Sequence, residues 1–226
     1  MKYIPFVLLG LALTVALAGL LPGLHPKPPL ARQEATTARA DPAIIALANA
    51  ARKYDLNPVL FIAISRFETA KTFSPMIGPG SSSAQGMCQM IASTRKAYGV
   101  KTAKYIRGIS GPKILFMIKT AQQQADACAR FTRDQIKAIR SMVGRKPTPG
   151  EIYLCHLQGL GGCRRVLQAA PGVSVSKVTS KGARKANGFI RRAKTAGGLR
   201  IAASNMMRRQ MAAVVVPSRD VCEAPF

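Results

Sequence analysis

The sequence predicts an all-α protein: a single globular domain with a segment on either side of it. Hydrophobic residues make up 48% of the 226 residues and charged residues 19%, which is typical of a folded chain. Helix-start signals, in which an N-cap residue directly precedes proline, recur along the chain. No segment alternates apolar and polar residues as a half-buried strand does.

The first 40 residues predict export and a connecting segment. Residues 1–24 join Lys2 to an uncharged apolar run over residues 4–21, as in a secretory signal. The run also reaches the lower length limit of a membrane span, so a cleaved signal and a retained anchor both stay open. Residues 25–40 are polar and rich in proline, which predicts a linker. The expected location is the periplasm, either free or anchored in the inner membrane.

Residues 41–193 form the predicted body, and two start signals open it. Asp41 precedes Pro42, and Asn57 precedes Pro58. An Asp or Asn side chain can accept a hydrogen bond from a backbone N–H in the first helical turn. Proline fits the first helical position because the N–H that it lacks would have no partner within the helix. The second of these helices is apolar nearly all round, so we expect it to be central.

Further helices are expected along the rest of the body. A helix over 87–98 should end at Gly99, and residues 112–141 should form one long helix or two. Thr148–Glu151 has the pattern of a capping box, which predicts another helix start. Residues 194–226 are expected to form a basic, loosely ordered tail.

The charge of the chain predicts binding to polyanions. Lys and Arg number 34 against nine Asp and Glu, giving a net charge of +25. Nucleic acid, anionic membrane and cell wall all attract such a chain. Export and the low aromatic content, 6%, argue against nucleic acid. The basic residues after Val173 are expected either to capture an anionic substrate or to form a generic basic face.

The five cysteines leave two alternatives open. An odd number leaves at least one thiol unpaired in a monomer, and the spacing matches no zinc pattern. The thiols are small buried groups, or some form disulfides. Cys155 and Cys163 flank a glycine-rich turn that could bring them together. No metal or other cofactor is expected.

Glu68 is the candidate catalytic group. It lies near the end of the apolar helix, and spacing by four places it on one face with Leu60 and Ile64. Apolar surroundings and the negative end of a helix favour a protonated carboxyl group. Such a group can protonate a glycosidic oxygen. The alternative is that Glu68 merely marks the helix end and points to water.

Three segments carry a resemblance to a known family. NPVLFIAISRFET, SSSAQGMCQMIAST and YLCHLQGLGG resemble, in order and spacing, the signature segments of the soluble lytic transglycosylases, within the lysozyme-like superfamily. Thr69 stands where the family usually has serine after the acid, and His156 where it usually has tyrosine. The third segment is similar to a phage and bacterial subgroup that reads Tyr-Leu-Ala-His. The resemblance covers residues 41 to about 190.

The resemblance implies a lysozyme-like fold and a lytic transglycosylase that cuts peptidoglycan. Glu68 would protonate the oxygen between N-acetylmuramic acid and N-acetylglucosamine, and the C6 hydroxyl would close a 1,6-anhydro ring. No second carboxylate is needed, and Glu151 is expected to be structural. The substrate-binding candidates are Ser83, Gly86, Gln89, Tyr153 and His156.

Two rival functions stay open. A muramidase of the same fold would hydrolyse the same bond with water, and a non-catalytic protein would only bind the wall. The expected partners are peptidoglycan glycan strands and an anionic membrane surface. A secretion or conjugation apparatus, wall turnover and a phage-derived lysis or entry system are the candidate settings.

Overall fold

The computed structural model describes residues 41–77, 83–100 and 113–218, with 113–119 described by backbone alone. These residues belong to one compact unit, Arg39–Phe226. The predictions for residues 1–24 and 25–40 lie outside the described residues. Within the described ranges, no helix is both long and apolar enough to cross a bilayer.

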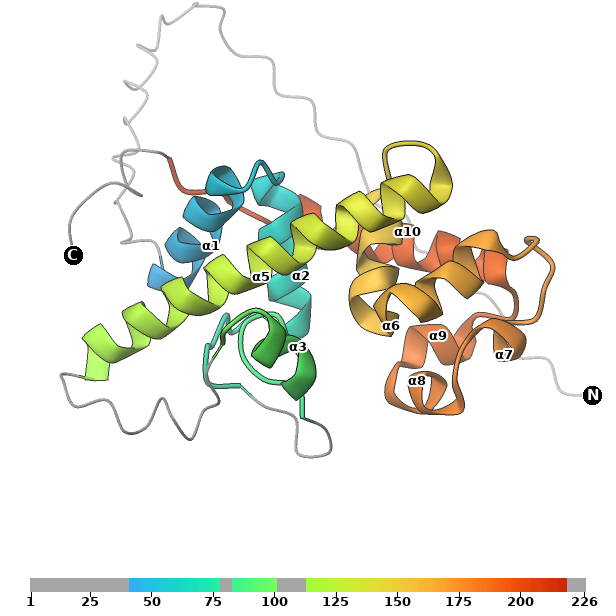
Figure 1. Cartoon of the computed structure of the whole chain (residues 1–226), viewed down its shortest axis with the longest axis horizontal. Helices are drawn as coiled ribbons and strands as arrows, with labels where there is room; N and C mark the ends of the chain where they lie inside the picture. The colour runs from blue at the N-terminus through green and yellow to red at the C-terminus, as the bar shows by residue number, and fades with distance from the viewer. Residues whose placement is uncertain (1–40, 78–82, 101–112, 219–226) are drawn as a thin grey trace, which may run out of the picture. The chain divides into compact units, whose positions relative to one another are not determined.

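The described part of the chain is helical, which confirms the all-α prediction. Its only strand-like features are two isolated bridges, Gln85 with Met90 and Ser174 with Thr195. The helices shown in Figure 1 are α1 (Pro42–Lys53), α2 (Pro58–Glu68), α3 (Ala92–Ala97), α5 (Lys113–Val143), α6 (Pro149–Gln168), α7 (Val175–Val178), α8 (Lys181–Ala186), α9 (Gly188–Arg192) and α10 (Ala196–Ala212).

The first two helices begin where the sequence predicts. The Asp41 carboxylate accepts from the Ala43 amide at 2.8 Å, and the Asn57 side chain accepts from the Leu60 amide at 3.1 Å. These bonds satisfy amides that have no partner inside a helix. Consecutive α2 residues from Leu60 to Ser65 are buried, so the prediction that α2 is central is confirmed.

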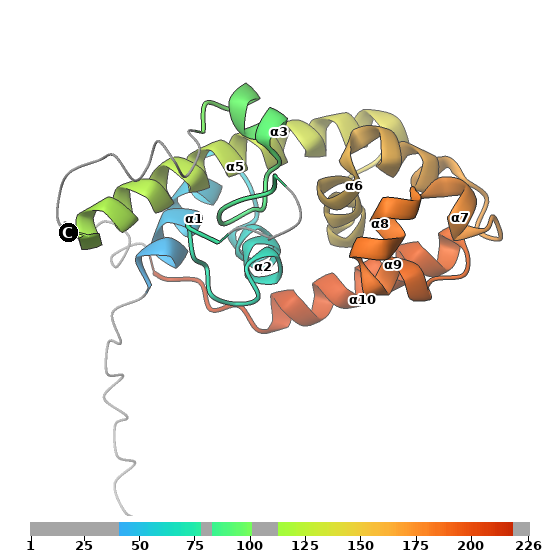
Figure 2. The same ribbon diagram turned by 90° about the horizontal axis from the view of Figure 1, so that it is seen from below.

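The long helices α5 and α10 pass on opposite sides of α2 and α6 (Figure 2). Helix α5 is continuous and packs on α1 and α6, while α10 packs on α6 and α2. Ile64 of α2, Ile139 of α5 and Met207 of α10 meet in one buried cluster. This cluster fixes the end of α2, where Glu68 lies, against α6.

The expectation of a loose tail over 194–226 is wrong for the residues described. Helix α10 occupies much of this segment, and the Thr195 hydroxyl caps it by accepting from the Gly198 amide at 3.1 Å. Leu199, Ala203 and Met207 recur every four residues and are fully buried. Small and basic neighbours conceal this apolar row in the sequence. The folded domain therefore extends beyond residue 193.

Two disulfides join segments of the described chain. Cys88 and Cys128 connect the loop before α3 to α5, with Cα atoms 6.3 Å apart. Cys155 and Cys163 span a break in α6 at Gly159, with Cα atoms 4.7 Å apart. Both separations fit a disulfide. On a chain-entropy argument, closing the longer of the two loops stabilises the fold by about 4 kcal/mol.

The predicted capping box at the start of α6 is present. The Thr148 hydroxyl accepts from the Glu151 amide at 3.3 Å, and the Glu151 carboxylate accepts from the Thr148 amide at 2.8 Å. Arg145 donates to both Glu151 oxygens, at 2.9 and 2.7 Å. Burial acts to raise the pKa of Glu151, but the bonds from Arg145 and Thr148 outweigh it and hold that pKa below its usual range.

We predict that Glu151→Gln lowers the free energy of unfolding by about 1 kcal/mol, the cost of a weakened cap. Because the folded-state pKa of Glu151 is lowered, the contribution of its carboxylate to the free energy of unfolding is complete above the unfolded-state pKa of about 4.3. That contribution is lost as the pH falls through the folded-state pKa. Urea unfolding of both proteins checks this. A difference as large in acid as at neutral pH would contradict it.

Candidate functional site

Glu68 lies in the wall of a pocket of about 460 Å³, here called the acid pocket. It is the last residue of α2, and its side chain is 13% exposed. The wall also includes residues from the loop before α3, from α3, from α5 and from the middle of α6: Gln89, Met90, Ile91, Thr94, Phe131, Gln135, His156, Leu157, Gln158, Gly159 and Leu160. The carboxyl group is therefore largely enclosed but reachable.

Tyr153 holds the candidate acid in place. Its hydroxyl donates to Glu68 Oε1 at 2.9 Å, and its side chain is 1% exposed. The Phe67 ring meets the Tyr153 ring edge-on, with centroids 5.2 Å apart. Since Oε1 is occupied, a neutral Glu68 carries its proton on Oε2, which has no protein hydrogen-bond partner among the described residues. That oxygen is the one able to deliver a proton.

His156 lies beside the acid but does not bond to it. Its Nε2 is 4.0 Å from Glu68 Oε1 and 2.9 Å from the Cys88 carbonyl oxygen. A carbonyl only accepts, so Nε2 carries the hydrogen and Nδ1 of a neutral ring is an acceptor. Nδ1 is buried with no partner among the described residues. The ring thus joins α6 to the loop before α3.

The loop with Gly86 and Gln89 is a turn, so the prediction that Gln89 lies in a helix is wrong. Gln89 has a φ of 45°, and α3 begins only at Ala92. The Gln89 side-chain amide donates to the carbonyls of Ile77 and Gly86, at 3.1 and 3.0 Å. These two bonds close the turn, and Gln89 still lines the acid pocket.

Gly86 and Ser83 are not among the residues that line the acid pocket. Gly86 has a φ of 77°, and a Cβ there would collide with the Gln124 side chain. Both observations require glycine for structural reasons. The Ser83 hydroxyl accepts from the Ala92 amide at 3.2 Å at the start of α3. The structure gives both residues a part in shaping the loop.

Sequence reasoning missed the contribution of α5 to the acid pocket. Phe131 and Gln135 are one helical turn apart and both line it. The Gln135 amide donates to the Cys155 carbonyl at 3.1 Å, which ties α5 to α6, and its Oε1 is buried without a partner among the described residues. The available signal was a glutamine on the apolar face of α5, four residues before Ile139.

The other described carboxylates lie elsewhere. Asp126 is bonded to Lys53, Tyr54 and Arg130. Asp134 is bonded to Tyr98 and Arg133, Glu151 to Arg145, and Asp41 caps α1. Neither these nor Asp55 line the acid pocket. Among the described residues, no group of His, Cys, Asp and Glu could hold a metal ion.

The arrangement supplies one carboxyl group, oriented by a buried phenol, in a pocket of mixed polarity. Such a group can give a proton to a bound substrate and take one back. The Glu68 to Tyr153 bond makes this carboxyl a defined donor rather than a mobile surface group. No protein-family model matches the chain, and a search of curated proteins finds no match to it.

We predict that the Glu68 charge is detectable at Tyr153. Burial raises the pKa of Tyr153 well above its ordinary value, and the charge and hydrogen bond of Glu68 act in the same direction. Glu68→Gln should therefore lower this pKa while leaving it above the ordinary value of about 10. Tyrosine-labelled NMR in an alkaline titration measures it.

Tyr98 is the internal control for this titration. Burial and Asp134 raise its pKa, and Glu68 is not among the causes. Its titration should stay unchanged in the Glu68→Gln variant. If Tyr153 also titrates as in the unaltered protein, the contact between Tyr153 and Glu68 is absent in solution.

Proposed function

We propose that this protein is a peptidoglycan lytic transglycosylase with a lysozyme-like helical fold. The observation that carries the proposal is the carboxyl group of Glu68, the only one among the described residues of the acid pocket, whose Oε1 accepts from Tyr153 at 2.9 Å. The order of the three sequence segments, with their resemblance to the soluble lytic transglycosylases, supports the same function. Each of the three segments contributes residues to the acid pocket, among them Glu68, Gln89 and His156.

In this mechanism Glu68 acts twice. As an acid, it gives the proton on Oε2 to the oxygen between N-acetylmuramic acid and N-acetylglucosamine, and the bond from that oxygen to C1 breaks. As a base, the resulting carboxylate takes the proton of the C6 hydroxyl, whose oxygen bonds to C1. Glu68 is protonated again, and no water is consumed. Tyr153 keeps its hydrogen bond to Oε1 throughout and stabilises the carboxylate formed between the two steps.

The number of carboxyl groups among the described residues of the acid pocket favours this mechanism over hydrolysis. Retaining and inverting glycosidases normally use two carboxyl groups across the scissile bond, about 5–10 Å apart. The part of the acid pocket that the structure describes offers Glu68 alone. Internal attack by the C6 hydroxyl needs no second carboxylate, because the sugar supplies the nucleophile. A water-using muramidase remains the rival, and the identity of the new glycan end separates the two.

The proposed location is outside the cytoplasm, with the domain facing the periplasmic wall. Two disulfides among the described residues suit an oxidising compartment, as does the apolar run near the N-terminus. The net charge of +25 favours adhesion to anionic wall and membrane surfaces. Wall turnover, a secretion or conjugation apparatus, and a phage-derived system are the settings that such an enzyme fits.

We predict that Glu68→Gln abolishes the release of 1,6-anhydro-muropeptides from purified sacculi. The amide keeps the shape of the side chain and can still accept from Tyr153, but it has no proton to give. Mass spectrometry of the soluble products measures the release, and circular dichroism and sacculus binding check that the fold is kept.

Glu151→Gln is the matched control. It makes the same chemical change at a carboxyl group outside the acid pocket and should keep the activity at a temperature where it is folded. If Glu151→Gln is inactive while folded and Glu68→Gln is active, the assignment of the acid is wrong.

A further inference from the structure

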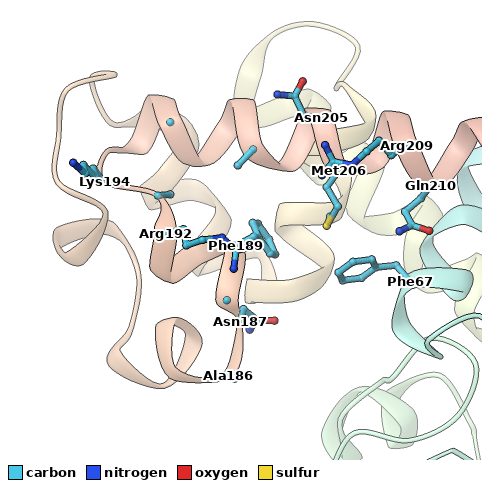
Figure 3. Close-up of a pocket in the computed structure, with 14 residues that line it drawn as sticks. Phe67, Ala186, Asn187, Phe189, Arg192, Lys194, Asn205, Met206, Arg209 and Gln210 are labelled. Atoms are coloured by element: carbon cyan, nitrogen blue, oxygen red, sulfur yellow. The ribbon is translucent and has the colours of Figure 1, made fainter. Parts of the chain in front are cut away.

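A second hollow, here called the basic pocket, lies between α9 and α10 next to the end of α2. Its volume is about 800 Å³, and it is open to solvent. Phe67 of α2, Phe189 of α9 and Met206 of α10 are among its lining residues (Figure 3), and all three pack in the same apolar cluster. Phe67 directly precedes the candidate acid in the chain. The basic pocket and the acid pocket therefore take consecutive residues from the end of α2.

A third hollow lies next to both the basic pocket and the acid pocket. It has a volume of about 300 Å³ and is lined by residues of α6 and α8. It shares Leu157 and Gln158 with the acid pocket, and Ala186 and Asn187 with the basic pocket. The three hollows thus adjoin one another. The acid pocket and the basic pocket therefore both border on the third hollow.

The charges of the basic pocket are not neutralised by the described part of the chain. Arg192, Lys194 and Arg209 line it and are exposed, and no carboxylate is among the described residues that line it. None of the three takes part in an ion pair with a described residue. The Arg192 guanidinium lies over Gly188, 3.2 Å from the place where a Cβ would be. The pocket wall therefore offers unpaired positive charge to an incoming anion.

Two other arginines nearby, Arg184 and Arg200, donate to backbone carbonyls. Arg184 donates to the carbonyls of Ser176 and Thr179, at 3.2 and 2.5 Å. Arg200 donates to three carbonyls at the end of α6, each at 3.1 Å. These arginines support the backbone, unlike Arg192 and Arg209. Arg192 and Arg209 are therefore available to bind a ligand, whereas Arg184 and Arg200 are not.

From these observations, and resting on the proposed function, we infer that the basic pocket binds the carboxylate-bearing peptide stem of peptidoglycan while Glu68 cuts the adjoining glycan bond. The stem branches from the lactyl group of N-acetylmuramic acid, so it leaves the glycan beside the bond that is cut. Its carboxylates match guanidinium groups, which bind them through paired hydrogen bonds. Its aliphatic parts match the apolar side chains of Phe67, Phe189 and Met206 in the pocket wall.

The test compares soluble, uncrosslinked glycan strands with and without their peptide stems. The full-length protein should cut peptide-bearing strands with a kcat/KM about tenfold or more above that for stripped strands. The double variant Arg192→Gln/Arg209→Gln should lose this preference by slowing on peptide-bearing strands alone. The control Arg140→Gln/Arg164→Gln makes the same charge change at exposed arginines outside the three hollows and should keep the preference.

Two kinetic outcomes overturn the inference. One is an unaltered protein that cuts both kinds of strand equally well. The other is a double variant that slows equally on both, since the arginines would then attract the glycan generally or support the fold. A protein that cuts neither kind of strand contradicts the proposed function instead.

A binding measurement then tests the pocket without catalysis. Calorimetry with full-length Glu68→Gln protein uses N-acetylmuramyl-L-alanyl-D-glutamate and its diamide, which lacks the carboxylates. We expect the acid to bind more tightly than the diamide by about tenfold or more, and the added Arg192→Gln/Arg209→Gln change to remove the difference. Equal binding of the two ligands, or an undiminished difference in the variant, overturns the inference.

Discussion

The hydrogen bond from the Tyr153 hydroxyl to Glu68 Oε1 joins two helices through residues 85 positions apart in the chain. Both side chains are largely withdrawn from water, so the bond forms where electrostatic interactions are weakly screened. It fixes which carboxyl oxygen is occupied and which can exchange a proton. The ring of Tyr153 also touches Phe67 and Phe189, which line the basic pocket. The acid and the proposed peptide site thus share one aromatic support.

Other contacts of the fold fix the positions of Tyr153 and Glu68 relative to each other. Helix α6 starts at a capping box reinforced by Arg145, which fixes the position of Tyr153 along the helix axis. A break at Gly159, with a φ of 66°, turns the chain in the wall of the acid pocket, and the Cys155–Cys163 disulfide spans it. His156 reaches from α6 to the carbonyl of Cys88, whose sulfur forms a disulfide with Cys128 of α5. Several independent links therefore converge on the acid pocket.

Local signals in the sequence were sufficient for much of this architecture. Asp41, Asn57 and Thr148 each accept the backbone hydrogen bond that their position before proline predicts, because an N-cap needs only neighbouring residues. The apolar character of α2 likewise predicts its burial. Helix α10 was missed because its buried row is spaced among basic and small residues, and only packing on α6 reveals it.

The sequence predicted several residues of the candidate site, but not the hydrogen bonds that they make. The spacing of Tyr153 and His156 places them on one face of a helix, but only the fold shows that the tyrosine bonds Glu68 and the histidine bonds a carbonyl. Gln89 takes a positive φ that a helical pattern cannot indicate. Phe131, Gln135 and the basic pocket depend on contacts between distant segments, which no local pattern encodes.

The central claim is that one carboxyl group, oriented by its hydrogen bond from Tyr153, cuts the glycan strand with the sugar's own hydroxyl as nucleophile. Digestion of sacculi in water enriched in oxygen-18, followed by mass spectrometry of the new glycan ends, tests it most directly. The account predicts anhydro ends that contain no oxygen-18, because no water enters the reaction. Reducing N-acetylmuramic acid ends that carry oxygen-18 from the moment of cleavage would contradict it and identify a hydrolase.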